Sequence, residues 1–361
     1  MKNICFLNGN MSKGGGTERV TSIIANELSK KKNNYKIHIL SIVSSNGKSF
    51  YRLDENIEFS SIFNKSNINF KINYFKVVCA IRKYIRNNNI DILIDVDIMS
   101  DIFSIPAKIF TKTKLISWEH FNCNQNNGER LRGISRLLAS KFSNCIVTLT
   151  EKDMNNYINR FKIKNKIQYI YNPIVNFPEK KCDIKSKIII SVGNLIYQKG
   201  VDMICDIAKV ILSENDEWSW IILGEGNDRK LLEEKIKEYE LENKLILKGN
   251  VSDVENYYIN SSIYVMTSRY EGLPMVLLEA KSFALPIISF DCETGPSEIV
   301  NDGINGYLIE PNNIDSMILK INDLIKNDLK RSEFSKNSNR GLEKFDLNKI
   351  IDKWEELFNN V

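Results

Sequence analysis

The chain has 361 residues, of which 43% are hydrophobic and 26% charged, and its formal net charge is +5. This length predicts two domains, and the composition excludes a disordered, collagen-like or many-spanning membrane protein. The charge is unevenly distributed: residues 1–172 carry 27 Lys+Arg and 13 Asp+Glu, a net of +14, whereas residues 173–361 carry 23 and 32, a net of −9. A basic half is typical of proteins that contact nucleic acid, anionic lipid or an anionic substrate.

The cysteines and the N-terminus indicate the compartment. The seven cysteines form no CxxC pair, so we expect neither a zinc site nor a disulfide framework, and a reducing, cytoplasmic environment. The first residues lack the apolar core of a signal peptide. No apolar run approaches the 18 residues of a spanning helix.

In the first half, short β-branched runs alternate with longer amphipathic stretches. In chain order the pattern predicts a strand at 4–7, a helix at 17–30, a strand at 37–43, a helix at 70–87, and strands at 90–94, 115–118, 145–149 and 167–170. Alternation of strands with helices is typical of right-handed βαβ units and a parallel sheet.

The second half repeats this pattern. It predicts a strand at 188–192, a helix at 201–212, a strand at 220–223, a helix at 229–239, strands at 245–247 and 263–266, a helix at 275–283, strands at 286–290 and 306–309, and a last helix at 348–359. Two such series predict an α/β protein with two doubly wound domains.

Two prolines mark the boundary between these domains. Proline lacks an amide donor, so Pro173 and Pro178 suit a linker better than a central strand. We therefore predict a first domain at 1–172, a linker at 173–186, a second domain at 187–345 and a C-terminal helix at 346–361. Because parallel sheets bind ligands at the carboxyl ends of their strands, functional residues are expected in the loops that follow strands.

The first such loop is rich in glycine. Gly14, Gly15, Gly16 and Thr17 lie between the first strand and the first helix. Glycine allows close backbone approach, and a helix N-terminus favours an anion. The loop has neither the Walker A pattern nor the GxGxxG spacing, so it is either a substrate-facing loop or a surface turn.

The loop after the first strand of the second half contains Gly193, Asn194, Lys199 and Gly200. A lysine at this position could neutralise a phosphate group. The alternative is a solvated lysine beside a turn glycine.

The most informative segment is 271–280, which follows the strand at 263–266. It combines a proline suited to a first helical turn with amides that can face an anion and two carboxylates that can accept sugar hydroxyls. The residues concerned are Glu271, Gly272, Leu273, Pro274, Met275 and Glu279. An ordinary amphipathic helix is the alternative.

Two further patterns involve histidine and aspartate. His38 alternates within an apolar strand and is expected to be structural, whereas His120 lies where a strand meets a loop. Asp95 and Asp97 form a DxD, a metal-binding signature of a single-domain transferase architecture. Two βαβ halves argue against that architecture, so we interpret the two aspartates as polar strand-end residues.

Together these segments resemble the family-4 group of retaining glycosyltransferases, the glycosyl transferases group 1, which have the GT-B fold. The matching residues are Gly193…Lys199-Gly200, Glu271-Gly272-Leu273-Pro274…Glu279, Gly303…Gly306-Tyr307-Leu308 and, more loosely, Trp118-Glu119-His120 and Gly14–Gly16. The resemblance implies two Rossmann-like domains that face a central cleft, with the last helix returning to the first domain.

The resemblance also implies residue roles. Lys199 contacts the donor diphosphate, Glu279 the ribose and Glu271 the donor sugar, while Val251 lines the nucleoside pocket. His120 approaches the sugar from the first domain, and the Gly14–Gly16 loop borders the acceptor. Many members have arginine where this chain has Asn194. Either the donor binds more weakly here or another arginine compensates, for which Arg269 and Arg19 are the candidates.

The implied reaction is retaining, metal-independent transfer of a sugar, most often from a UDP-sugar, to a hydroxyl of a glycan. No cofactor or metal is expected. The implied acceptor is a polyprenyl-linked glycan of a bacterial surface polysaccharide, such as O-antigen or capsule. The basic amphipathic helix at 70–87 would place the protein at the cytoplasmic face of the inner membrane, or it is a normal surface helix.

Three alternatives remain. A sugar-nucleotide epimerase or a phosphorylase would keep the fold and change the reaction. A nucleic-acid-binding protein would use the basic half, but recognised motifs are absent and the acidic half would repel a phosphate backbone.

Overall fold

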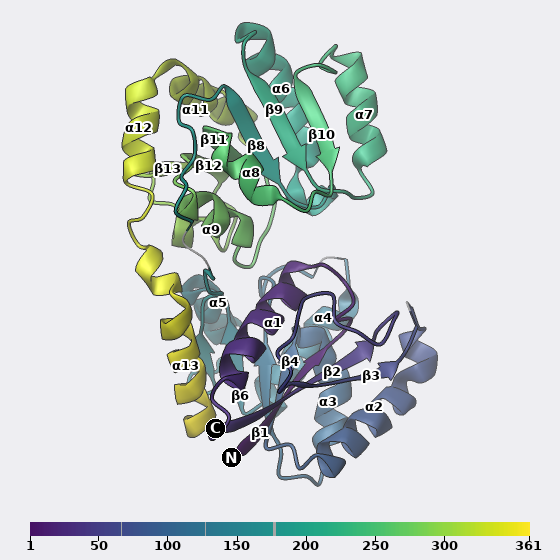
Figure 1. The fold of residues 1–361 in the computed structure, drawn as a ribbon. Coiled ribbons are helices and arrows are strands. Elements are labelled where there is room, and N and C mark those ends of the chain that lie inside the picture. The colour runs from purple at the N-terminus through teal and green to yellow at the C-terminus, as the bar shows by residue number, and fades with distance from the viewer. Residues whose placement is uncertain (66, 127, 176–177) are drawn as a thin grey trace. The chain divides into compact units, whose positions relative to one another are not determined.

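The computed structural model describes residues 1–65, 67–126, 128–175 and 178–361. Their contacts divide the chain into two compact units (Figure 1). Unit 1 comprises Met1–Pro173 and Phe345–Val361, and unit 2 comprises Ile174–Lys344.

Unit 1 is built on a seven-stranded parallel sheet with the order β3-β2-β1-β4-β5-β6-β7. Its strands are β1 (Lys2–Asn8), β2 (Tyr35–Val43), β3 (Glu58–Phe63), β4 (Ile92–Val96), β5 (Lys114–Trp118), β6 (Cys145–Thr148) and β7 (Ile167–Tyr169). Its helices are α1 (Gly16–Ser29), α2 (Phe70–Asn87), η1 (Ile98–Ser100), α3 (Asp101–Lys108), α4 (Arg130–Phe142), α5 (Glu151–Phe161) and α13 (Leu347–Asn360).

Unit 2 is built on a six-stranded parallel sheet with the order β10-β9-β8-β11-β12-β13. Its strands are β8 (Ile188–Val192), β9 (Ser219–Leu223), β10 (Leu245–Gly249), β11 (Ile263–Met266), β12 (Ile287–Phe290) and β13 (Gly306–Ile309). Its helices are η2 (Tyr197–Lys199), α6 (Val201–Glu214), α7 (Arg229–Glu238), α8 (Val254–Ile259), α9 (Met275–Ser282), α10 (Pro296–Ile299), α11 (Ile314–Lys326), α12 (Asp328–Lys336) and η3 (Leu342–Phe345), whose last residue belongs to unit 1.

Both sheets are doubly wound, and this confirms the predicted fold class. In each, the chain order reverses about the first strand, so that β1 pairs with β4 and β8 pairs with β11. The loops after these central strands diverge at the reversal and leave a crevice, the usual ligand position of open α/β sheets. The fold therefore predicts one site per unit, after β1 and β4 and after β8 and β11.

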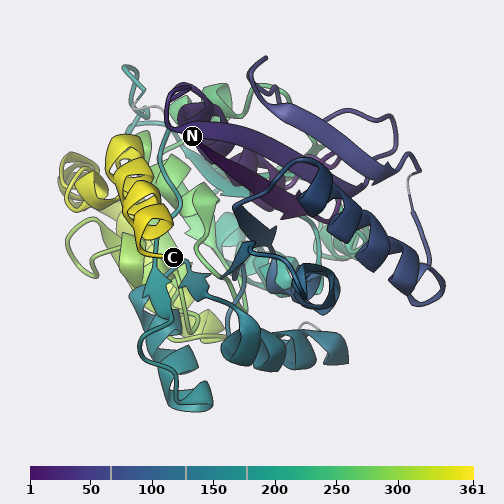
Figure 2. The same ribbon diagram turned by 90° about the horizontal axis from the view of Figure 1, so that it is seen from below.

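The C-terminal helix α13 packs on unit 1, as predicted. Trp354 is fully buried, and its ring lies 4.9 Å from that of Trp118 at the end of β5. The Lys2 ammonium donates to the Phe358 carbonyl at 2.6 Å, and the two chain termini accordingly lie close together (Figures 1 and 2). The first domain is thus completed by residues from the end of the chain.

The predicted linker at 173–186 belongs in part to unit 2. The amides of Cys182 and Asp183 donate to the carbonyls of Phe283 and Ile259 at 2.8 and 2.7 Å. At the other boundary, Phe345 was expected in the second domain but is buried in unit 1, where its ring lies 4.9 Å from that of Tyr171.

The α2 helix covers the predicted range 70–87, but its apolar stripe is used inside the protein. Val77, Ile81 and Ile85 are buried in the core that α2 forms with the sheet. The two apolar side chains that remain most exposed on α2 are Ile72 and Phe75, at 81% and 79%. The stripe itself therefore gives no evidence for a lipid-facing surface.

We expect Trp354→Ala to destabilise unit 1 by about 3–5 kcal/mol, because it removes a large, fully buried side chain. Hydrogen-exchange mass spectrometry should show lost protection in β1 and β5 and unchanged protection in β8. The exposed Glu356→Ala on the same helix is the control. Equal loss of protection in both units would contradict the assignment of α13 to unit 1.

Candidate functional site

The loop after β8 in unit 2 holds Lys199 at a tightly constrained turn. Gly200 has φ +63°, and a Cβ there would lie 2.0 Å from the Thr267 carbonyl oxygen. The Thr267 hydroxyl in turn donates to the Lys199 carbonyl at 3.0 Å. The loop that follows β8 is thus fastened to the loop that follows β11, and only glycine fits at position 200.

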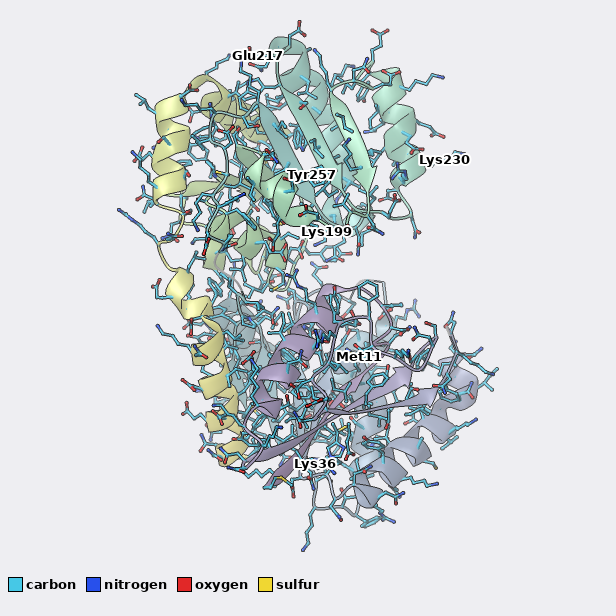
Figure 3. All side chains as sticks on the ribbon, viewed as in Figure 1. Met11, Lys36, Lys199, Glu217, Lys230 and Tyr257 are labelled. Carbon is cyan, nitrogen blue, oxygen red and sulfur yellow. The ribbon has the colours of Figure 1, made fainter. Side chains whose placement is uncertain are left out.

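Lys199 and Glu271 form an ion pair at this point. Lys199 Nζ lies 2.6 Å from Glu271 Oε1, and the two side chains are 21% and 7% exposed. The stem of Lys199 passes over Gly193, where a Cβ would lie 3.7 Å from it. Lys199 and the exposed Glu217 lie at opposite ends of the second sheet (Figure 3). The sequence analysis singled out Lys199 and Glu271 as candidate site residues, but it did not predict that they form an ion pair.

The segment from Glu271 to α9 is fixed by its neighbours. The Thr294 hydroxyl donates to the Glu271 carbonyl at 2.5 Å, and Gly295, at φ +102°, packs so close that a Cβ would lie 2.5 Å from Pro274 Cδ. The first backbone bond of α9 is donated by Leu277 to Pro274 at 3.1 Å. The amides of Gly272, Leu273 and Met275 precede that bond and lie at the positive end of the helix dipole.

The other predicted donor residues also lie in unit 2. Glu279, in α9, accepts a hydrogen bond from the Tyr258 hydroxyl at 3.0 Å. Val251, in the loop after β10, is half-buried, and Asn194, after β8, is exposed. These positions follow the carboxyl ends of β8, β10 and β11, where ligands of such sheets bind.

Arg269, one of the two candidates to compensate for Asn194, forms an ion pair with Asp202. The Arg269 guanidinium donates to both carboxylate oxygens of Asp202, at 2.8 and 2.7 Å, and it stacks over the Tyr197 ring at 4.0 Å. Arg269 is therefore paired with Asp202, as Lys199 is with Glu271. Arg19, the other candidate, lies in α1 of unit 1.

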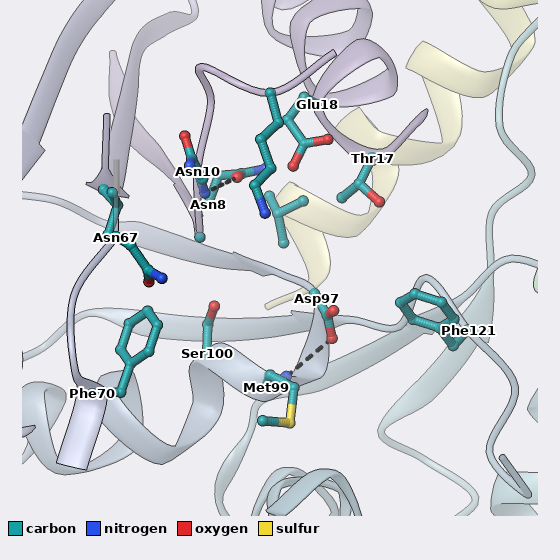
Figure 4. A pocket seen from close by; sticks show the side chains of 14 residues that line it. Asn8, Asn10, Thr17, Glu18, Asn67, Phe70, Asp97, Met99, Ser100 and Phe121 are labelled. Carbon is teal, nitrogen blue, oxygen red and sulfur yellow. Dashed lines mark hydrogen bonds between the residues drawn. The ribbon is translucent and has the colours of Figure 1, made fainter. Parts of the chain in front are cut away.

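Unit 1 contains a cavity of about 330 Å³ at the corresponding place (Figure 4). It lies beside the carboxyl ends of β1 and β4, which are Asn8 and Val96. The polar lining is Asn8, Asn10, Lys13, Thr17, Glu18, Asn67, Asp97 and Ser100, and the remaining lining is Gly9, Val43, Val96, Phe70, Met99 and Phe121. Sequence reasoning interpreted the loop from Asn8 to Glu18 as substrate-facing or a surface turn and Asp97 as a polar strand-end residue, and it did not assign the remaining lining residues to a site.

The predicted glycine loop borders this cavity. Thr17 lines it, whereas Gly14, Gly15 and Gly16 do not. The Glu18 carboxylate, which also lines the cavity, folds back so closely that a Cβ on Gly15 would lie 2.3 Å from its Oε2. Burial raises the pKa of Glu18. Gly15 therefore lets a lining carboxylate pack against the loop.

The two aspartates of the DxD have different partners, which argues against a joint metal site. Asp95 is fully buried and accepts a hydrogen bond from Ser104; burial raises its pKa to about 7. Asp97 instead forms two hydrogen bonds with the Arg132 guanidinium, at 2.7 and 3.1 Å. Within the described ranges no group of three or more His, Cys, Asp or Glu side chains could hold a metal ion.

Asp97 also has a strained backbone. Its φ of +75° is unusual for a residue other than glycine and costs on the order of 1–3 kcal/mol. Its carboxylate accepts from the Met99 amide at 3.1 Å and so caps η1. Burial raises the pKa of Asp97 even though Arg132 favours the carboxylate.

Glu119 is the centre of a buried ionic cluster next to the cavity residue Phe121. It is fully buried, and its carboxylate accepts from Arg136 at 2.7 Å and from the Tyr157 hydroxyl at 2.6 Å. Although burial opposes ionisation, the guanidinium of Arg136 holds the pKa of Glu119 below its usual range. No sequence signal distinguished Arg132 and Arg136 from ordinary surface cations of an amphipathic helix.

His120 follows Glu119 and precedes Phe121, which lines the cavity. It is buried, its ring lies 4.3 Å from that of Trp118, and its Nε2 has no hydrogen-bond partner among the described residues. Burial lowers the pKa of His120 to about 3. The imidazole is therefore neutral near pH 7, which suits positioning better than proton donation.

Comparison with known proteins shows the family. Residues 175–341 match the family model of glycosyl transferases group 1. The amylovoran biosynthesis glycosyltransferase AmsD of Erwinia amylovora is 31% identical over 99% of this chain and 100% of its own length. The chain belongs to the glycosyl transferases group 1. The expected family resemblance is therefore confirmed.

Two further comparisons agree. An α-1,4-N-acetyl-D-galactosaminyltransferase of Campylobacter jejuni, named for an undecaprenol-diphosphate-linked GalNAc acceptor, is 27% identical over 100% of this chain and 99% of its own length. The structure of HepE from Anabaena, in complex with UDP and glucose, matches with a TM-score of 0.82 at 16% identity and covers 99% of both chains. This structural likeness confirms the GT-B fold.

We expect His120 to remain neutral between pH 8 and 5. The chain has two histidines, so a His38→Gln variant leaves one imidazole signal for NMR titration. Because an unfolded histidine binds its proton near pH 6.5 and His120 only near pH 3, its burial makes stability rise with pH between about pH 3 and 6.5. A midpoint near pH 6.5 in the folded variant would contradict the buried, neutral imidazole.

Proposed function

We propose that this glycosyltransferase moves a sugar from a UDP-sugar to a hydroxyl of a glycan acceptor, with retention of anomeric configuration and without a metal ion. The observation that carries the proposal is the Lys199–Glu271 pair at the reversal point of the second sheet. A cation and a carboxylate stand there beside a helix N-terminus, which together match the diphosphate and the sugar of a donor.

Lys199 would leave Glu271 and bind the donor diphosphate. The reaction breaks the bond between the anomeric carbon and a phosphate oxygen, so negative charge grows on the leaving diphosphate. Lys199 lies at the turn that Gly200 fixes, and the amides of Gly272, Leu273 and Met275 lie in the segment that Gly295 packs against. Such preorganised donors can stabilise this charge in place of a metal ion.

Glu271 and Glu279 would hold the rest of the donor. Once released from Lys199, the Glu271 carboxylate can accept hydrogen bonds from hydroxyls of the transferred sugar. Glu279, held by Tyr258, can accept from the ribose hydroxyls. Val251 and Asn194 would border the nucleotide.

The anomeric configuration would be retained because the acceptor attacks the anomeric carbon on the same face from which the leaving group departs. The acceptor oxygen forms the new bond to the anomeric carbon, and its proton passes to the departing phosphate oxygen. This route needs no protein base, which agrees with the lowered pKa of His120, because an imidazole with a pKa of about 3 is a weak base. His120 would then position the sugar, and the loop Gly14–Thr17 would border the acceptor.

The relatives support the substrate classes. HepE is described with UDP and glucose, which favours a UDP-sugar donor. AmsD is named for amylovoran biosynthesis and the Campylobacter relative for an undecaprenol-linked acceptor. We infer a polyprenyl-linked glycan of a bacterial surface polysaccharide, such as O-antigen or capsule, as the acceptor. The epimerase and phosphorylase alternatives are not favoured by these relatives.

We also propose that unit 1 contacts the cytoplasmic face of the inner membrane through α2. No helix in the described part of the chain is both long and apolar enough to cross a membrane. The outer side of α2 exposes Lys71, Lys76, Lys83 and Arg86 beside Ile72 and Phe75, and the helix has no acidic residue. Anionic lipid headgroups match this combination of cations and apolar side chains.

We expect Lys199→Ala and Glu271→Gln each to lower kcat/KM for transfer at least tenfold, about 1.4 kcal/mol in the barrier. The first removes the cation that meets the leaving group, and the second removes a charged sugar contact. Transfer is measured as UDP released in the presence of a polyprenyl-linked glycan extract.

The control for this pair is Lys187→Ala. Lys187 pairs with Glu217 on the surface of the same unit, where both side chains are at least half exposed. We expect unchanged kcat/KM, because exposed ion pairs contribute little. Near-normal transfer by both site variants would reject the assignment. UDP release that does not depend on acceptor would favour a hydrolysing epimerase instead.

We expect the double variant Ile72→Ser/Phe75→Ser to bind phosphatidylglycerol vesicles at least about fivefold more weakly than the wild type, because apolar side chains anchor a helix at the interface. Sedimentation with phosphatidylglycerol and with phosphatidylcholine vesicles measures this. Leu231→Ser, at an exposed leucine of α7 in unit 2, is the control. Equal binding of the wild type to both lipids, or to neither, would refute the membrane proposal.

A further inference from the structure

The wall of the unit 1 cavity is built around one arginine. Arg132, from α4, is 4% exposed and binds both oxygens of Asp97. The same guanidinium lies over the Phe121 ring, 4.4 Å from its centroid. Asp97 and Phe121 both line the cavity (Figure 4). One buried side chain therefore fixes a polar and an aromatic residue of the same wall.

This arrangement holds Asp97 in a conformation that it would not adopt by itself. With φ at +75°, its backbone has a conformation that is unfavourable for residues other than glycine. Two hydrogen bonds from Arg132 and one from the Met99 amide hold the carboxylate in place. Strain of this kind persists only where surrounding contacts impose it, and it concentrates at ligand sites.

A second, independent feature of the cavity is an unsatisfied amide. Asn8, the last residue of β1, lines the cavity and is 1% exposed. Its Oδ1 accepts from the Asn10 amide at 2.9 Å, whereas its Nδ2 has no partner among the described residues. A buried donor without a partner costs free energy unless a ligand or water satisfies it.

The lining chemistry indicates which ligand fits. Asp97 and Glu18 offer carboxylates, the asparagines offer amides, and Lys13 is the one cationic side chain among the residues known to line the cavity. Such groups pair with hydroxyls, whereas two carboxylates disfavour an anionic ligand. Phe121 offers a flat apolar surface for the C–H face of a ring. A volume near 330 Å³ is within the range of small-ligand pockets.

We propose that this cavity binds an uncharged sugar residue of the acceptor, with Asp97 accepting its hydroxyls, Phe121 packing against its ring, and Arg132 acting as the positioning residue that fixes both. The inference rests on the proposed glycosyl transfer, since it assigns part of the acceptor in that reaction. It makes Asp97 and Phe121 determinants of acceptor specificity, while Lys199 and Glu271 serve the donor.

The test measures acceptor and donor binding separately. The probes are the octyl glycosides of glucose, galactose, N-acetylglucosamine, N-acetylgalactosamine and glucuronic acid, with UDP as the donor-site probe. Dissociation constants are measured by ligand-observed NMR and by calorimetry. The variants are Arg132→Met, Arg132→Lys, Asp97→Asn and Phe121→Leu. Arg130→Met, an exposed arginine two residues earlier on α4, is the matched control.

We expect at least one uncharged glycoside to bind the wild type. Arg132→Met, Asp97→Asn and Phe121→Leu should weaken it at least tenfold, and UDP affinity should stay within twofold of the wild type. Arg132→Lys should recover part of the loss, because it keeps the cation over Phe121 and loses the double hydrogen bond. Since Arg132→Met could prevent folding, Asp97→Asn and Phe121→Leu test the site with the guanidinium in place.

Three results would overturn the inference. The wild type could bind UDP but none of the uncharged glycosides, the glucuronide could bind more tightly than they do, or all variants could bind like the wild type. Failure of the proposed function gives a different result, in which the wild type neither binds UDP nor consumes a UDP-sugar. The two proposals can therefore fail independently.

Discussion

The loops at the reversal point of the second sheet depend on the pairing of Lys199 with Glu271. Both side chains are largely shielded from solvent. Leaving either charge unpaired there would cost folding free energy, so each side chain holds the other in place. The proposed sugar-nucleotide donor would supply a new partner to each side chain, its diphosphate to Lys199 and its sugar hydroxyls to Glu271. The glycines at 200 and 295 allow the close packing that fixes the two loops. The pair is thus already arranged for the donor that we propose.

Unit 1 has the same reversal of strand order but different side chains around it. Its reversal point holds a cavity with carboxylates, amides and aromatic rings, and a single lysine among the lining residues. The charges of Arg132 and Arg136 are paired with those of Asp97 and Glu119 inside the protein. The net charge of +14 therefore does not describe the cavity. The cations left on the surface, such as those on the outer side of α2, account for the basic character of this half.

The sequence predicted the two doubly wound sheets, the bounds of β8, β11, β13 and α2, and the position of Lys199 and Glu271 in loops that follow strands, because these depend on local periodicity and on motifs close together in the chain. It missed β3, an edge strand whose residues are mostly only partly buried, and α3, which contains Pro106. It also missed the helices α4, α5, α8, α10, α11 and α12. It also missed Arg132, Asp97 and Phe121 as a group. Their relation requires tertiary contacts between segments about 10 to 35 residues apart, which periodicity does not report.

The measurement that tests the central claim most directly is calorimetric titration of UDP and of uridine into the wild type and into Lys199→Met. If Lys199 leaves Glu271 to bind the diphosphate, UDP should bind the wild type at least tenfold more tightly than uridine, about 1.4 kcal/mol. This difference should largely disappear in Lys199→Met, while uridine affinity stays the same. Equal affinities for UDP and uridine in the wild type, or an unchanged preference for UDP in the variant, would contradict the account.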